Sequence, residues 1–203
     1  MISKGEETRK LLRLSLLVAG GTVLHVVESH LPALSTLPGA KLGLANIVTM
    51  LTLMSYSPAD TWKVVGLRVF LGSLLGGTFL TTTFFLSTAG AIGSTTVMIL
   101  ALFLGQGSLS TVGISILGAV AHNVAQLLMA VFLTRSWGIV LYLPYLLLFA
   151  LPTGYFVGVL SRFILRSAPS FSPLHLVGNG RKRQDLTREC RICHWSSHTP
   201  KED

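Results

Sequence analysis

Charged residues are nearly absent from the middle of this sequence. Between Leu14 and Ser161 the only Lys, Arg, Asp and Glu residues are Glu28, Lys41, Asp60, Lys63, Arg68 and Arg135. A helix that crosses a bilayer needs about 20 mostly apolar residues, so this stretch has room for about six such helices. The whole chain is only 12% charged, about half the share found in an average soluble domain. We therefore predict an all-α membrane protein, a bundle of about six transmembrane helices.

The expected spans follow the apolar runs and the residues that interrupt them. Pro58 and Asp60 are expected to break the helix between the second and third spans, and the glycines of Gly76–Thr78 are expected to do so between the third and fourth. Pro144 and Pro152 are expected to kink the last span. The six spans are then expected at about residues 11–27, 42–56, 63–75, 79–104, 109–133 and 139–165.

The last part of the chain differs in composition from the rest. We assign residues 1–170 to the transmembrane domain and residues 171–203 to a polar, basic tail, which is too poor in apolar residues to form a core and is predicted to be disordered. The tail contains Cys190, Cys193, His194 and His198, which match a haem-attachment pattern and could also offer zinc ligands. Their spacing is tighter than in ordinary zinc modules. We interpret them as incidental and predict no metal site and no cofactor.

The net charge of +8 comes from basic residues gathered at the two ends of the chain, as in the Arg181–Arg183 run. Basic clusters that flank spans are typical of cytoplasmic ends beside anionic lipid. We therefore expect a multi-pass protein of the cell (inner) membrane with both termini in the cytoplasm. No motif for reading a nucleic-acid groove accompanies the charge, and we predict no nucleic-acid partner.

Polar residues interrupt the apolar pattern where the first two spans meet, in "HVVESHLPALSTLPGAKLGLANI". With the termini inside, this stretch lies on the outer side, where Glu28 ends one span and Lys41 and Asn46 begin the next. Helix starts offer free N–H groups, so these three residues are candidate ligand-binding groups beneath a loop at 31–39. Alternatively, Glu28 and Lys41 simply pair with each other at the interface.

A polar stripe marks the fifth expected span. Ser115, Ala119, His122 and Gln126 follow one another at helical spacing, with Asn123 beside them. Because an unsatisfied polar group in hydrocarbon costs several kcal/mol, these side chains need partners. They form either an interhelical hydrogen-bond clamp or part of a ligand pocket that they share with the outer residues.

Small residues on the first span, Ser15 and Ala19 followed by Gly20, allow another helix to approach closely. They mark either internal packing or a docking face for a partner membrane protein.

Two motifs, "LPGAKLGLANIVTM" and "GAVAHNVAQL", resemble the Gx transporter family, also named heptaprenyl diphosphate synthase component I. The resemblance covers about residues 8–166. That family looks related to the substrate-binding S components of energy-coupling factor transporters. It implies a six-helix membrane bundle with an outward-opening pocket, and a docking role for the small residues of the first helix.

The two family names imply different functions. Prenyl diphosphate synthesis needs aspartate-rich clusters that hold magnesium, whereas Asp60, Asp185 and Asp203 lie far apart, and no "GxxxxGK[ST]" loop is present. We therefore predict no enzyme activity. The leading hypothesis is the substrate-binding component of an uptake transporter for a small solute, with separate transmembrane and ATPase subunits as partners. The alternative is a non-catalytic membrane accessory subunit in heptaprenyl diphosphate or quinone side-chain synthesis.

Overall fold

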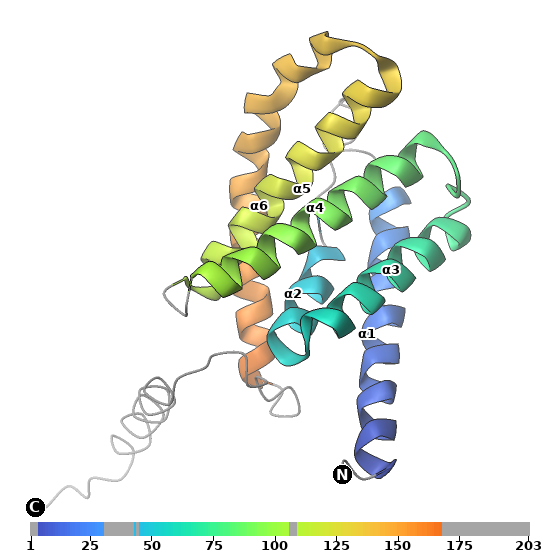
Figure 1. Cartoon of the computed structure of the whole chain (residues 1–203), viewed down its shortest axis with the longest axis vertical. Coiled ribbons are helices and arrows are strands. Elements are labelled where there is room, and N and C mark those ends of the chain that lie inside the picture. Colours follow the sequence, from blue (N-terminus) through green and yellow to red (C-terminus); the bar gives the residue numbers. More distant parts are fainter. Residues whose placement is uncertain (1–3, 31–42, 44, 106–108, 168–203) are drawn as a thin grey trace, which may run out of the picture.

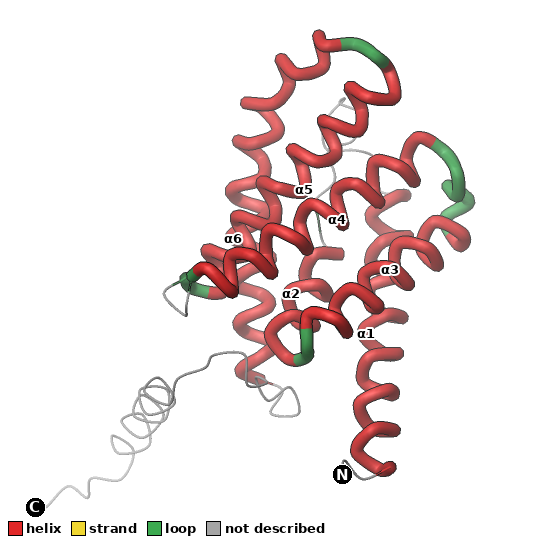
Figure 2. Tube along the Cα trace, viewed as in Figure 1, coloured by secondary structure: helices red, strands yellow, loops and turns green. Residues whose placement is uncertain are grey.

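The computed structural model describes residues 4–30, 43, 45–105 and 109–167. Within these ranges the chain is all-helical, with no strand. The elements in chain order are α1 (Lys4–His30), α2 (Ala45–Ser55), α3 (Pro58–Leu75), α4 (Thr82–Leu104), α5 (Thr111–Thr134), the short 3-10 helix η1 (Trp137–Tyr142) and α6 (Leu143–Ser167). The predicted fold class, an all-α membrane bundle of six helices, is confirmed (Figures 1 and 2).

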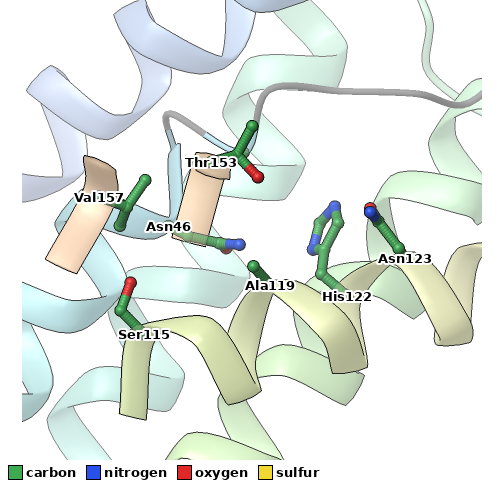
Figure 3. A pocket seen from close by; sticks show the side chains of 8 residues that line it. Asn46, Ser115, Ala119, His122, Asn123, Thr153 and Val157 are labelled. Carbon is green, nitrogen blue, oxygen red and sulfur yellow. The ribbon is translucent and has the colours of Figure 1, made fainter. Parts of the chain in front are cut away.

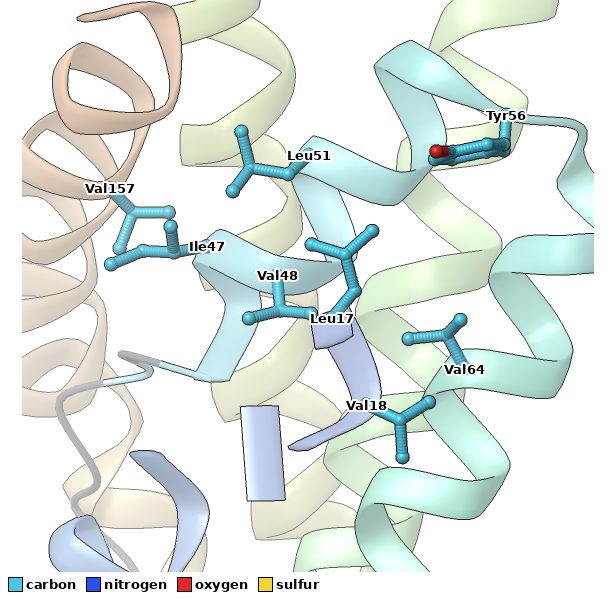
Figure 4. Packing of buried hydrophobic residues seen from close by; sticks show 8 residues of the cluster. All are labelled: Leu17, Val18, Ile47, Val48, Leu51, Tyr56, Val64 and Val157. Atoms are coloured by element: carbon cyan, nitrogen blue, oxygen red, sulfur yellow. The ribbon is translucent and has the colours of Figure 1, made fainter. Parts of the chain in front are cut away.

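The shortest of the described α-helices, α2, lies at the centre of the bundle. It is in contact with all five other α-helices, and ten of its 11 residues are buried. Ile47, Val48 and Leu51 of α2 pack between Leu17 of α1 and Val157 of α6 (Figure 4). A helix of 11 residues is about 16 Å long, roughly half the thickness of the hydrocarbon core. The first turn of α2 therefore lies within the bundle, among the surrounding helices.

Within the part of the chain that the structure describes, four helical segments are long and apolar enough to cross a membrane: Glu7–Glu28, Thr82–Leu104, Thr111–Thr134 and Trp137–Ser167. Large apolar side chains such as Leu16, Phe132 and Leu141 are more than two-thirds exposed, as expected for surfaces that face lipid. The helix α3 carries Asp60, Lys63 and Arg68, and α2 is short. The charged residues of α3 and the shortness of α2 distinguish these two helices from the four apolar spans.

The turn between α2 and α3 corrects one detail of the sequence prediction. The helix before Pro58 ends as expected, but α3 begins at Pro58 and not near residue 63, because proline needs no N–H donor in the first turn. Ser57 is the N-cap, and its hydroxyl accepts a hydrogen bond from the Asp60 backbone N–H at 3.3 Å. Asp60 also pairs with Lys10 of α1 at 2.5 Å, which joins the first turn of α3 to the early part of α1.

The glycines after α3 end that helix as predicted. Gly76 is its C-cap, and Gly77 has a φ of +64°, a conformation that glycine adopts without strain. Pro152 lies inside α6, which continues through it, and the expected kink there stays a prediction.

The start of α1 and the end of α6 lie on the same side of the bundle, as Figure 1 shows. Leu14 of α1 packs against the same buried cluster as Ile164 and Leu165 of α6. The predicted position of both termini in the cytoplasm stays a prediction. The tail assigned to 171–203, its four Cys and His residues, and the loop at 31–39 lie outside the described residues.

Candidate functional site

A cavity lined by polar side chains lies beside the first turn of α2. Its volume is about 20 Å³, room for about one water molecule. Four long helices and the start of α2 contribute to its walls. The polar side chains that line it are His25, Glu28, Asn46, Arg68, Ser87, His122 and Gln126.

A second cavity of about 10 Å³ adjoins the first, and the two share Gly43, Asn46 and His122. Ser115 and Asn123 of α5 and Thr153 of α6 complete its polar lining. In Figure 3 the side chains of Asn46 and His122 point toward each other across it. We refer to the two together as the polar cavity.

The polar cavity brings together residues that the sequence singled out in two distant segments. Glu28, Asn46, His122 and Gln126 line the larger part, and Asn123 lines the smaller part. Asn123 also donates a hydrogen bond to the Leu146 carbonyl oxygen at 3.1 Å, which links α5 to α6. Lys41 lies outside the described residues. A role for any of these residues in ligand binding stays a prediction.

Arg68 is the main residue of the site that the sequence reasoning missed. Its side chain is 2% exposed, and its Nη1 donates a hydrogen bond to the Ala45 carbonyl oxygen. Glu28 is also buried, and its carboxylate accepts a hydrogen bond from the Gly43 N–H. The two opposite charges attract each other. Together they hold the chain segment that starts α2 between α1 and α3. An arginine within an apolar helix was a readable signal, because such residues are costly in membranes.

Glycines on α1 and α3 make room for polar side chains of the opposite helix. A Cβ atom on Gly21 of α1 would lie 2.8 Å from Cδ of Arg68, and a Cβ atom on Gly72 of α3 would lie 2.6 Å from Cδ2 of His25. Gly21 and His25 are four positions apart on α1, as are Arg68 and Gly72 on α3. The glycine of each helix therefore packs against the polar residue of the other helix. His25 belongs to the site through this packing and was not predicted.

A glycine of α4 likewise makes room for polar side chains of α5. A Cβ atom on Gly90 of α4 would lie 2.7 Å from Cε1 of His122 and 2.8 Å from Cγ of Gln126. The α4 backbone at Gly90 thus forms part of the wall behind these polar residues. Close approach through small residues is a common way to pack helices in membranes.

Substitution of Gly21 by alanine tests the packing of the Arg68 side chain against this glycine. The added methyl group would collide with the Arg68 side chain, and we expect Gly21→Ala to lower the free energy of unfolding by about 1–3 kcal/mol. Gly20→Ala is the matched control, since a Cβ atom there has no neighbour within 4 Å among the described residues. Because alanine is the better helix former, the control should be neutral or more stable by about 0.5–1 kcal/mol. Thermal unfolding in detergent, followed by circular dichroism, compares the two variants. Equal stability would contradict the packing of Arg68 against Gly21.

Several buried polar atoms around the polar cavity have no hydrogen-bond partner among the described residues. They are Asn46 Oδ1, Arg68 Nε, Ser115 Oγ and Gln126 Nε2. Their side chains are at most 4% exposed. Since buried polar groups are normally satisfied, these atoms are available to a molecule within the cavity.

The described part of the chain holds no group of three or more His, Cys, Asp or Glu residues that could bind a metal ion. Cys190, Cys193, His194 and His198 are outside that part.

Ser15 and Ala19, the predicted docking residues, are exposed on α1, and Gly20 beside them is exposed as well. The neighbouring Leu17 and Val18 point into the core. The small residues thus lie on the outer face of α1, away from the bundle.

The fold and the cavity together define a class: an α-helical membrane protein with a small, buried, polar cavity at the centre of its bundle. Residues 17–164 match the family model described as heptaprenyl diphosphate synthase component I. The chain belongs to this family, as its motifs predicted. The matched range includes every residue that lines the polar cavity. No curated protein and no solved structure matches the chain.

Proposed function

We propose that this protein is the membrane-embedded solute-binding component of an uptake transporter, energised by a separate ATPase complex. The observation that carries the proposal is the polar cavity, with the buried Arg68 and with polar atoms that have no partner among the described residues. Polar and ionisable groups inside a membrane bundle are expensive and usually mark a substrate path. The sequence has no "GxxxxGK[ST]" motif, so ATP-driven transport would need separate ATPase subunits.

Binding without covalent chemistry is the proposed mechanism. The cavity has a volume of about 20 Å³, which accommodates about one water molecule. Binding of a larger solute therefore requires the helices around the start of α2 to move apart. Glu28 and Arg68 hold that segment, so solute entry and the position of α2 are coupled in this proposal. The protein sits in the cell membrane with both termini in the cytoplasm, which reporter fusions at each end would test.

The family description favours a second candidate, a non-catalytic membrane accessory subunit in heptaprenyl diphosphate or quinone side-chain synthesis. Co-purification from native membranes distinguishes the two. Recovery with transporter ATPase subunits, together with a bound small molecule detected by mass spectrometry, supports uptake. Recovery only with a soluble prenyltransferase supports the accessory role and overturns the first proposal.

The exposed small residues of α1 supply a sharper test of the uptake proposal. We expect Ala19→Leu to reduce recovery of the transmembrane and ATPase partners at least about tenfold, because a larger side chain keeps the partner helix at a distance. Leu16→Phe, on the same exposed face but already large, is the matched control and should retain the partners. Thermal stability of both variants should equal that of the original protein. Undiminished recovery with Ala19→Leu would remove this face from the docking surface.

A further inference from the structure

The charges that line the polar cavity are already balanced within the protein. Among the described lining residues, Arg68 carries the only full positive charge and Glu28 the only negative charge, apart from the titratable His25 and His122. Arg68 is engaged by the Ala45 carbonyl oxygen and Glu28 by the Gly43 N–H. An anionic solute would therefore compete with Glu28 for Arg68 and leave a buried negative charge without compensation, which is costly.

The polar groups that remain open to a solute include two side-chain amides. Asn46 of α2 is 4% exposed and Gln126 of α5 is 3% exposed, and both line the larger part of the polar cavity. Asn46 Oδ1 and Gln126 Nε2 have no hydrogen-bond partner within the described part of the chain. The first atom is an acceptor and the second is a donor. A solute that presents both an N–H and a carbonyl oxygen would satisfy the two atoms.

Resting on the proposed binding function, we infer that the polar cavity takes a small uncharged solute with an amide-type edge, in which an N–H donor lies beside a carbonyl acceptor. The N–H donates to Asn46 Oδ1, and the carbonyl oxygen accepts from Gln126 Nε2. Arg68 Nε, also buried without a described partner, is a second donor for the same carbonyl group. A diphosphate does not fit this pattern, since it offers no N–H and brings several negative charges to one already balanced cation.

Benzamide and benzoate provide a matched pair of probes, because they share ring and size and differ in charge and in the N–H donor. The full chain, purified in detergent, is heated with millimolar benzamide, benzoate or inorganic pyrophosphate. We expect benzamide to raise the Tm in a dose-dependent manner, and the two anions to leave it unchanged.

The Gln126→Leu variant tests where benzamide binds. It removes the donor at similar volume, and since Gln126 Nε2 lacks a described partner, the variant should fold at least as well without ligand. It should lose the Tm shift caused by benzamide. Thr95→Val is the matched control: Thr95 is fully buried, its Oγ1 lacks a described partner, and it does not line the cavity. This control should keep the full shift.

Each other outcome overturns the inference. A shift with benzoate or pyrophosphate that Gln126→Leu abolishes would make the ligand class wrong and leave the binding function standing. An equal benzamide shift in Gln126→Leu would place the probe elsewhere. No shift with any probe would also reject the amide class. The proposed binding function is then decided separately by the co-purification experiments, which use none of these probes.

Discussion

Replacement of Arg68 by methionine is expected to lower the free energy of unfolding by about 3–5 kcal/mol, the usual result of removing one partner from a buried charge pair. Glu28 would stay buried without the opposite charge that now attracts it. The Ala45 carbonyl oxygen at the start of α2 would lose its hydrogen-bond donor. Methionine preserves much of the side-chain volume, so the loss reports mainly on charge and hydrogen bonding. Denaturant unfolding in detergent, followed by circular dichroism, measures it.

Two further variants separate the charge effect from general damage. Arg162→Met makes the same substitution at an exposed position of α6 and should change stability little. Adding Glu28→Gln to Arg68→Met removes the uncompensated carboxylate and should restore a substantial part of the loss. An Arg68→Met protein as stable as the original would show that the buried guanidinium does not hold this part of the bundle together.

Substitution of Gly158 by valine is expected to cost at least about 2 kcal/mol, because it forces α5 and α6 apart. A Cβ atom on Gly158 would lie 2.7 Å from Cα of Val112, and one on Gly154 would lie 2.8 Å from Cα of Ile116. Backbone atoms cannot rotate away as the end of a flexible side chain can. We therefore expect a lower Tm and a smaller monodisperse fraction in size-exclusion chromatography.

Gly66→Val is the matched control for Gly158→Val. It makes the same change in helix propensity on α3, at a position where a Cβ atom has no neighbour within 4 Å among the described residues. The difference between the two variants isolates the contact between α5 and α6. Similar losses in both would indicate that propensity, and not helix approach, explains the effect.

The "GYFVG" sequence at 154–158 shows what pattern reading could have found. Two glycines four positions apart are a known signal for close helix packing in membranes, and the structure places both against α5. A glycine pair predicts a contact face, but it does not predict which neighbouring helix fills that face.

For the site too, the sequence indicated which residues share a helix face but not which helices they contact. Helical spacing placed His122 and Gln126 on one stripe, since residues four apart share a face, and both line the polar cavity. Arg68 and His25 were missed because their roles depend on contact between helices. Each of them packs over a glycine of the opposite helix, Gly21 and Gly72 respectively.

The sequence by itself determined the class of the protein, because the scarcity of charge from Leu14 to Ser161 is typical of helices in an apolar surrounding. Its motifs predicted the family, which the family-model match confirms. Local signals also placed the end of α3 at Gly76, whereas that helix begins at Pro58 and not near residue 63. Only the tertiary structure decided that the short α2 occupies the centre and that Glu28 and Arg68 meet at its first turn. The physical reason is that spans of similar hydropathy pack in many arrangements, and the choice among them depends on matching side chains to glycines across helices far apart in sequence.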